Sequence, residues 1–121
     1  SLQCSLTGKW LNDLGSTMRI SPPDDAGAFS GSYLTKVSIS NQTIVKSPLW
    51  GAQHKRDQPT FGFVVLWNFT ATTTTFVGQC FVDEKGVETL ETLWLLRKEV
   101  PKHGDDWWGT LVGKNVFKRI K

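Results

Sequence analysis

Neutral hydrogen-bonding residues alternate with aromatic residues along several stretches of this sequence. Asn12 and Ser16 follow Trp10 at even spacing, and Tyr33 and Thr35 form a similar pair further along. A β-strand sends alternate side chains to opposite faces, so each set would lie on one face of a strand. A buried amide or hydroxyl without a partner costs about 1 to 3 kcal/mol. Several of them on one interior therefore predict mutual hydrogen bonds or a ligand with polar edges.

The same spacing recurs later in the chain and brings more aromatic residues to the same interior. The stretch from Gln58 to Thr70 is rich in β-branched and aromatic residues, which is typical of a strand. One face of this stretch carries Phe61, Phe63, Val65, Trp67 and Phe69. Further sets with shared faces are Thr72, Thr74 and Phe76; Trp94 and Leu96; and Leu111, Gly113, Asn115 and Phe117. We predict that these faces line a pocket.

Residues that could support catalysis or hold a metal are not arranged for either. Asp105 and Asp106 are adjacent, so their side chains diverge, and no nucleophile or base accompanies them. His54 and His103 each fall in a loop beside a lysine at no metal-ligand spacing. We therefore predict no catalytic residue, no metal site and no cofactor, and hence a protein that is not an enzyme.

The elements that must position these residues are short strands, because turn signals separate them and helical periodicity is weak. The predicted strands are 8–14, 17–21, 28–37, 43–53, 59–69, 74–82, 88–97 and 110–118. Eight strands with short links indicate an antiparallel up-and-down β-barrel or a β-sandwich. A barrel of this size can enclose one small ligand. We expect a single domain over residues 1–121.

Composition indicates the compartment. The net charge is +3, and the scattered charges favour a soluble basic surface over nucleic-acid binding. No apolar run approaches the roughly 18 to 20 residues that span a membrane, and the opening without Met indicates a mature or trimmed chain. Cys4 and Cys80 fit one disulfide, and sequons at Asn41 and Asn68 permit N-glycosylation. We predict a secreted, extracellular protein with no nucleic-acid or membrane partner.

The later strands are also apolar on their outward faces. Leu93, Leu95 and Val112 point away from the predicted interior, and Val64 and Leu66 do so on an earlier strand. Such a surface is commonly covered in an oligomer. Lys114 interrupts this apolar surface.

Several separated motifs closely resemble the avidins, the vertebrate egg-type biotin-binding proteins. They are Cys4-Ser-Leu-Thr-Gly-Lys-Trp-Leu-Asn-Asp-Leu-Gly-Ser16, Gln58-Pro-Thr-Phe-Gly-Phe63, Phe76-Val-Gly-Gln-Cys-Phe81, Thr92-Leu-Trp-Leu-Leu-Arg97 and Gly104-Asp-Asp-Trp107. The resemblance runs in order from Cys4 to Phe117. It implies an all-β, eight-stranded antiparallel up-and-down barrel, avidin/streptavidin-like, that binds biotin very tightly in its interior as a homotetramer.

The resemblance also implies a role for each matching residue. Asn12, Ser16 and Tyr33 would donate to the ureido oxygen, while Thr35 and Asn115 would accept from the ureido N–H groups. Thr74 would lie near the thioether sulfur. The apolar wall around the ring and tail would comprise Leu14, Trp67, Phe69, Phe76, Trp94 and Leu96, with Phe61 and Phe63 in the core beneath it. The carboxylate end would meet Val37, Ser38, Ile39, Ser40, Thr70 and Thr72, and Trp107 would reach a neighbouring subunit's pocket.

The implied role is to sequester the vitamin, in host defence against microbes or in storage. Ile39, Thr70 and Thr72 depart from the family pattern at the carboxylate end, and Lys114 departs from it at a subunit contact. Because of Lys114, a dimer stays open as the alternative to the tetramer. A lipocalin-like carrier or a sugar-binding barrel is the alternative, because both also use aromatic surfaces and neutral polar groups. A hydrolase is the other class considered, and no residue pattern favours it.

Overall fold

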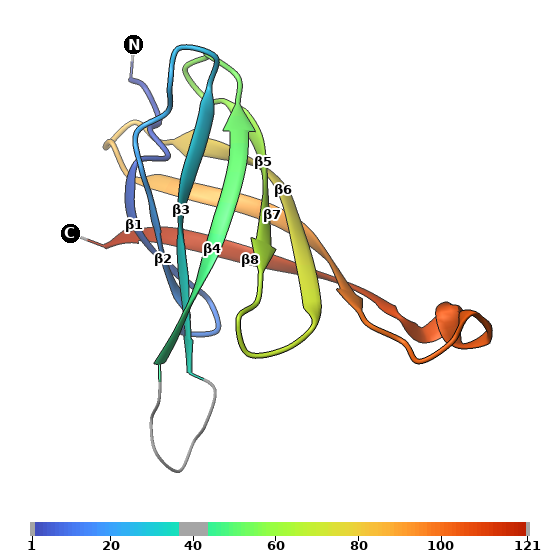
Figure 1. Cartoon of the computed structure of the whole chain (residues 1–121). Helices are drawn as coiled ribbons and strands as arrows, with labels where there is room; N and C mark the ends of the chain where they lie inside the picture. The colour runs from blue at the N-terminus through green and yellow to red at the C-terminus, as the bar shows by residue number, and fades with distance from the viewer. Residues whose placement is uncertain (1, 37–43, 121) are drawn as a thin grey trace.

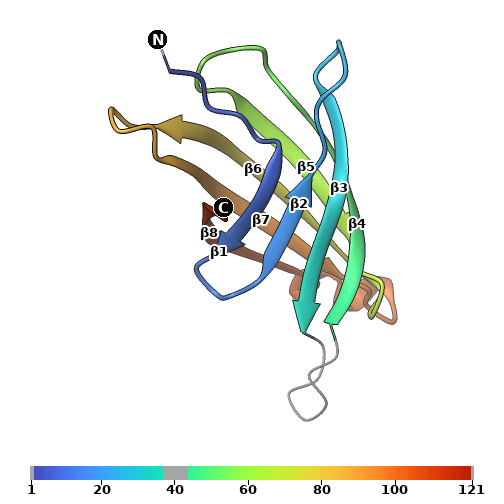
Figure 2. The same cartoon turned by 90° about the vertical axis from the view of Figure 1, so that its left-hand side faces the viewer.

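A computed structural model describes residues 2–36 and 44–120 of the chain as a closed antiparallel β-barrel (Figures 1 and 2). Each strand pairs with its neighbour in sequence, and β1 pairs with β8 to close the barrel. The elements are β1 (Gly8–Asn12), β2 (Thr17–Ile20), β3 (Ala28–Lys36), β4 (Ile44–Gln53), β5 (Thr60–Leu66), β6 (Thr72–Val82), β7 (Glu88–Lys98), the 3-10 helix η1 (His103–Trp108) and β8 (Thr110–Ile120). The predicted up-and-down barrel is confirmed, and the sandwich alternative is wrong.

Strand bounds differ from the predicted ranges mainly at turns. The first strand ends at Asn12 rather than Leu14, because the chain turns through Gly15, whose φ of 89° favours glycine. The Asn12 side chain stabilises this turn by accepting hydrogen bonds from the backbone N–H groups of Leu14 and Ser16, at 2.9 and 2.8 Å. The short helix η1 lies in a region predicted to be a loop.

The hydrophobic core fills one end of the barrel. Phe61 and Phe63 are buried and stacked, and Phe63 stacks in turn on Phe76 with ring centroids 4.7 Å apart. Phe61 and Phe63 therefore lie in the core, as predicted. The other large buried side chains of this end are Leu6, Trp10, Met18, Ile20, Phe29, Leu49, Leu90 and Phe117. The other end of the barrel interior is hollow and forms the cavity described below.

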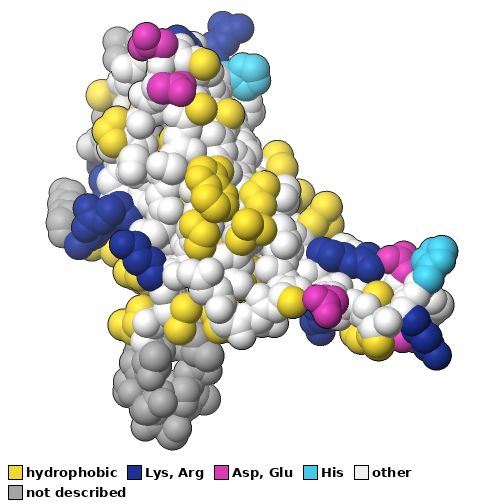
Figure 3. Space-filling model, in the orientation of Figure 1, with side chains coloured by type: hydrophobic (Ala, Val, Ile, Leu, Met, Phe, Trp, Pro, Cys, Tyr) yellow, Lys and Arg dark blue, Asp and Glu magenta, His cyan; other side chains and the backbone are white. Residues whose placement is uncertain are grey.

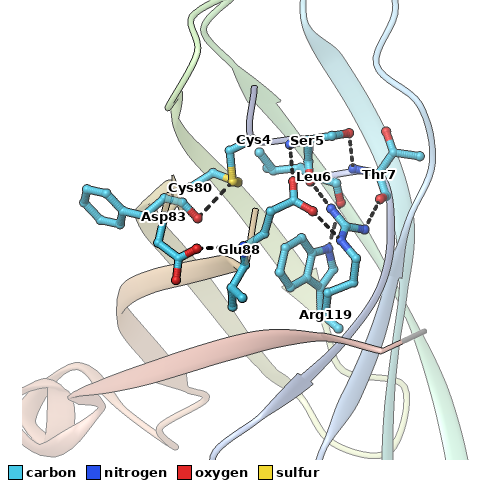
Figure 4. Close-up of polar contacts among 11 residues, drawn as sticks. Cys4, Ser5, Leu6, Thr7, Cys80, Asp83, Glu88 and Arg119 are labelled. Atoms are coloured by element: carbon cyan, nitrogen blue, oxygen red, sulfur yellow. Dashed lines mark hydrogen bonds and ion pairs between the residues drawn. A yellow bond between two sulfur atoms is a disulfide. The ribbon is translucent and has the colours of Figure 1, made fainter. Parts of the chain in front are cut away.

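The N-terminal segment closes the filled end of the barrel (Figure 4). A disulfide joins Cys4 to Cys80 of β6, which confirms the predicted pair. Arg119 of β8 lies 4.3 Å from the centre of the Trp10 ring and donates to the carbonyl oxygens of Ser5 and Thr7. The same guanidinium is 2.7 Å from the carboxylate of Glu88. These contacts hold the N-terminal segment against β6, β7 and β8 at the filled end of the barrel.

The outer surface of the later strands is apolar, as the sequence predicts. Its exposed side chains include Leu66, Val77, Leu93, Leu95 and Val112. Hydrophobic side chains also gather over β4 and β5 on the face shown in Figure 3. Helix η1 projects away from the barrel beyond the ends of β7 and β8 (Figure 1). Within the described ranges, no helix is long and apolar enough to cross a membrane.

Candidate ligand-binding site

The hollow end of the barrel forms a cavity of about 380 Å³. Its lining consists of Asn12, Leu14, Ser16, Tyr33, Thr35, Trp67, Phe69, Thr70, Thr72, Thr74, Phe76, Trp94, Leu96, Lys98, Leu111 and Asn115. The structure thus brings together most of the residues predicted to contact a ligand. Two lining residues, Lys98 and Leu111, were not in the predicted set. The predicted residues Val37, Ser38, Ile39 and Ser40 lie outside the described residues.

Three side chains from β1, the following turn and β3 present hydrogen-bond donors to the cavity. Asn12 uses its side-chain oxygen on the turn backbone, so its amide nitrogen faces the interior and donates to the Tyr33 hydroxyl at 2.9 Å. Since the Tyr33 oxygen accepts this bond, its own proton is left to donate elsewhere. Ser16 adds a hydroxyl as the third donor in the same part of the wall. The turn that ends β1 therefore determines which atoms point inward.

Tyr33 lies among aromatic rings as well as polar groups. Its ring is stacked on Phe76 and meets Trp67 edge-on, with centroids 5.9 and 5.1 Å apart. Burial raises the pKa of the Tyr33 hydroxyl well above its ordinary value, although the hydrogen bond from Asn12 opposes the shift. The hydroxyl consequently remains protonated, and able to donate, across the physiological range.

The side chain of Asn115, on β8, leaves its amide oxygen free for a ligand, whereas Asn12 presents its amide nitrogen. The amide nitrogen of Asn115 donates to the carboxylate of Asp13 at 2.8 Å, so its oxygen is left free to accept. This hydrogen bond lowers the pKa of the Asp13 carboxyl below its usual value. Asp13 was absent from the predicted set, because it lies in a turn off the two-residue period and meets a residue 102 positions away.

Thr35 of β3 presents a second acceptor. The oxygen of its hydroxyl is buried and has no hydrogen-bond partner within the part of the chain that the structure describes. Buried polar atoms are nearly always paired, so an unpaired one in a cavity wall points to a ligand. Thr35 and Asn115 thus provide acceptors where Tyr33, Asn12 and Ser16 provide donors.

The aromatic wall is held in place by specific contacts. The indole N–H of Trp67 donates to the Thr74 hydroxyl at 2.8 Å, which orients this ring. Trp94 of β7 lies against Gly113 of β8, its direct cross-strand partner. A Cβ atom at Gly113 would lie 2.1 Å from the Trp94 ring, so only glycine allows this packing. The flat faces suit a planar, apolar-faced ligand.

The mouth of the cavity combines apolar and polar groups. Leu14 lies in the turn after β1 rather than on a strand, and it is 80% exposed at the rim. Phe69, Thr70, Thr72 and Lys98 complete the described part of the mouth. Trp107, on η1, is 83% exposed and does not line its own chain's cavity. Its position is compatible with the predicted contact to another subunit.

Comparisons with known proteins agree with this geometry. A family model described as the Avidin family matches residues 1–120. The chain belongs to the avidin family. Avidin from Gallus gallus is 52% identical over 98% of this chain and 80% of its own length. Avidin-related protein 1 from the same organism is 56% identical over 97% of this chain and 79% of its own.

Solved structures show the same likeness. The biotin binding protein from chicken superposes on this avidin-family chain with a TM-score of 0.89 and 57% identity, covering 98% of each chain. Avidin-family proteins are non-catalytic biotin-binding proteins, so we assign the chain no enzymatic activity. The resemblance inferred from the motifs is therefore confirmed, whereas the contact made by each lining residue stays a prediction.

Two lining residues had a signal in the sequence. Leu111 shares a face with Asn115 in the predicted last strand, although it was not chosen as a site residue. Lys98 follows Trp94 and Leu96 on the same two-residue period, but the predicted strand stopped one residue short of it. Extending the strand by one residue would have placed Lys98 on the ligand-facing side.

Proposed function

We propose that this chain binds biotin tightly and without catalysis, in the open end of the barrel. The ureido group of biotin has one carbonyl oxygen and two N–H groups. Tyr33, Asn12 and Ser16 offer donors for that oxygen, and Thr35 and Asn115 offer acceptors for the N–H groups. Biotin is the ligand in this proposal, and no cofactor takes part.

The observation that carries the proposal is the buried hydroxyl of Thr35, which has no hydrogen-bond partner among the described residues. Leaving such a group unmatched costs about 1 to 3 kcal/mol, which a protein tolerates where a ligand supplies the partner. A ligand N–H at this position would complete the hydrogen bonding of the wall. Asn115 supports the same reading, because Asp13 leaves only its oxygen free.

A thermal-melt panel tests the proposal. A ligand that binds only the folded state at 1,000 times its dissociation constant adds about 4 kcal/mol to the free energy of unfolding. We expect biotin to raise the melting temperature by many degrees, and fatty acids and simple sugars to leave it unchanged. A melting temperature unaffected by biotin would refute the proposal, and a rise with fatty acids or sugars would favour the carrier or lectin alternative.

We further propose that the protein assembles, as a tetramer in preference to a dimer, through the apolar outer face. The exposed Leu93, Leu95 and Val112 on β7 and β8 support this, while Lys114 opposite Leu93 weakens the contact. The exposed Trp107 would then enclose a neighbour's ligand. Light scattering with and without biotin measures the number of subunits in the assembly. Trp107→Lys should weaken assembly and speed the release of biotin. If Trp107→Lys changes neither the elution volume of the protein nor the dissociation rate of biotin, the role of Trp107 is refuted.

We also propose secretion and a role in sequestering biotin. The Cys4–Cys80 disulfide supports an oxidising compartment. Asn68 is exposed, so a glycan attached to its side-chain nitrogen would point outward. That nitrogen donates to the carbonyl of Lys46 at 2.7 Å, and attachment of the glycan would require this bond to be released. Asn41 lies outside the described residues. Peptide mapping of the secreted protein would show whether either sequon carries a glycan.

A further inference from the structure

Lys98 is the one charged residue in the described lining of the ligand cavity. It is the last residue of β7, two positions after Leu96 and four after Trp94, which line the same wall. At about 3.3 Å per residue, Lys98 lies about 13 Å along the strand from the ring-stacking tryptophan. It therefore marks the mouth, whereas the neutral donors and acceptors mark the interior.

The surroundings of Lys98 leave its ammonium group available. Its cross-strand partner is Thr72, whose hydroxyl also lines the mouth. The neighbouring Arg97 lies on the outer face and pairs with Asp106 at 2.6 Å. Lys98 itself forms no ion pair with any of the described residues. The nearest acidic residue in sequence, Glu99, alternates to the exposed side.

A lysine facing inward at this position is chemically selective. Lys98 as a residue is half-buried, and a charge beside a cavity wall attracts an anion more strongly than one in open water, because solvent screens the charges less. Hydrogen bonds between charged partners are also stronger than neutral ones. The cavity thus has an interior suited to a neutral polar ring and a mouth suited to a negatively charged tail.

We propose that Lys98 is a specificity-determining residue that selects ligands whose tail ends in a carboxylate. The inference rests on the proposed binding of biotin and adds the preference for the free acid over neutral derivatives. Thr72 beside it would share the carboxylate as a neutral donor.

The test compares biotin with biotin amide, which keeps the ring but has no charge on its tail. Dissociation constants and dissociation rates are measured for the full chain, for Lys98→Met and for Lys98→Arg. Lys118→Met is the matched control, since Lys118 is an exposed lysine on β8 outside the cavity lining. Thermal melts without ligand verify that each variant folds.

We expect the wild-type chain to prefer the acid, and Lys98→Met to lose about tenfold in affinity for biotin and little for the amide. Lys98→Arg should keep the preference, and Lys118→Met should behave as wild type. An acid-to-amide ratio unchanged in Lys98→Met overturns the inference while leaving biotin binding intact. Failure of the wild-type chain to bind either ligand instead overturns the proposed function.

Discussion

Replacing Thr35 by valine should change stability and binding in opposite directions. Valine has almost the shape of threonine but carries a methyl group where threonine has its hydroxyl. The Thr35 hydroxyl oxygen is buried and lacks a partner among the described residues. In the ligand-free protein the hydroxyl is therefore a cost, whereas in the complex it would accept a ligand N–H group.

The expected magnitudes follow from the price of an unmatched buried polar group, about 1 to 3 kcal/mol. Thr35→Val should raise the free energy of unfolding of the ligand-free protein by up to that amount. For a chain of 121 residues, each 1 kcal/mol corresponds to roughly 4 °C in melting temperature. The complex should lose about 1 to 3 kcal/mol, or about 5- to 150-fold in affinity, because a ligand N–H is left unmatched.

Calorimetric melts of the ligand-free variant and biotin-exchange kinetics of the complex measure the two effects separately. Thr35→Ser is the matched control, since it keeps the hydroxyl and should retain most of the affinity. A ligand-free Thr35→Val protein that is less stable than wild type would show that the hydroxyl has a partner. A variant that holds biotin as tightly as wild type would refute the acceptor role of Thr35.

Three further outcomes are expected. Tyr33 is the only tyrosine, and burial raises its pKa, so the native protein should show no phenolate absorbance at pH about 11, where an ordinary tyrosine is mostly ionised. The contribution of this shift to the free energy of unfolding is fully present below the ordinary tyrosine pKa near 10, and it is lost as the pH rises through the higher pKa of the folded protein. Gly113→Ala should displace the Trp94 ring and weaken both folding and binding by about 1 to 3 kcal/mol, and unchanged melts and ligand release would contradict the close packing. Asp13→Ala should speed ligand release, because it frees the Asn115 amide to rotate; equal release rates for this variant and the wild type at pH 7 would exclude this contribution. In the wild type the same effect should appear only when acid protonates Asp13, which its lowered pKa places below the ordinary aspartate value near 4.

Much of the cavity wall was predictable from local pattern. Tyr33 and Thr35 share a face because a strand repeats every two residues, and that spacing is visible without knowing any neighbour. The same reasoning placed Leu93 and Leu95 outside, whereas the resemblance to the avidins placed Phe61 and Phe63 in the core. Where the chain leaves a strand, the period fails, and Leu14 accordingly lies in a turn at the rim.

The sequence by itself determined the strands and their inward faces, because these depend on residue type and short-range spacing. It also determined the disulfide pair, because the chain has two cysteines. Only the tertiary structure decided which atoms of those residues point at a ligand. Asp13 and Asn115 are far apart in sequence, and barrel closure brings them together so that the Asn115 oxygen is left to accept. The register of β7 against β8 likewise sets Trp94 on Gly113, and the observed length of β7 brings Lys98 to the mouth. Register and closure arise from the packing of all the strands at once, which no single stretch of sequence encodes.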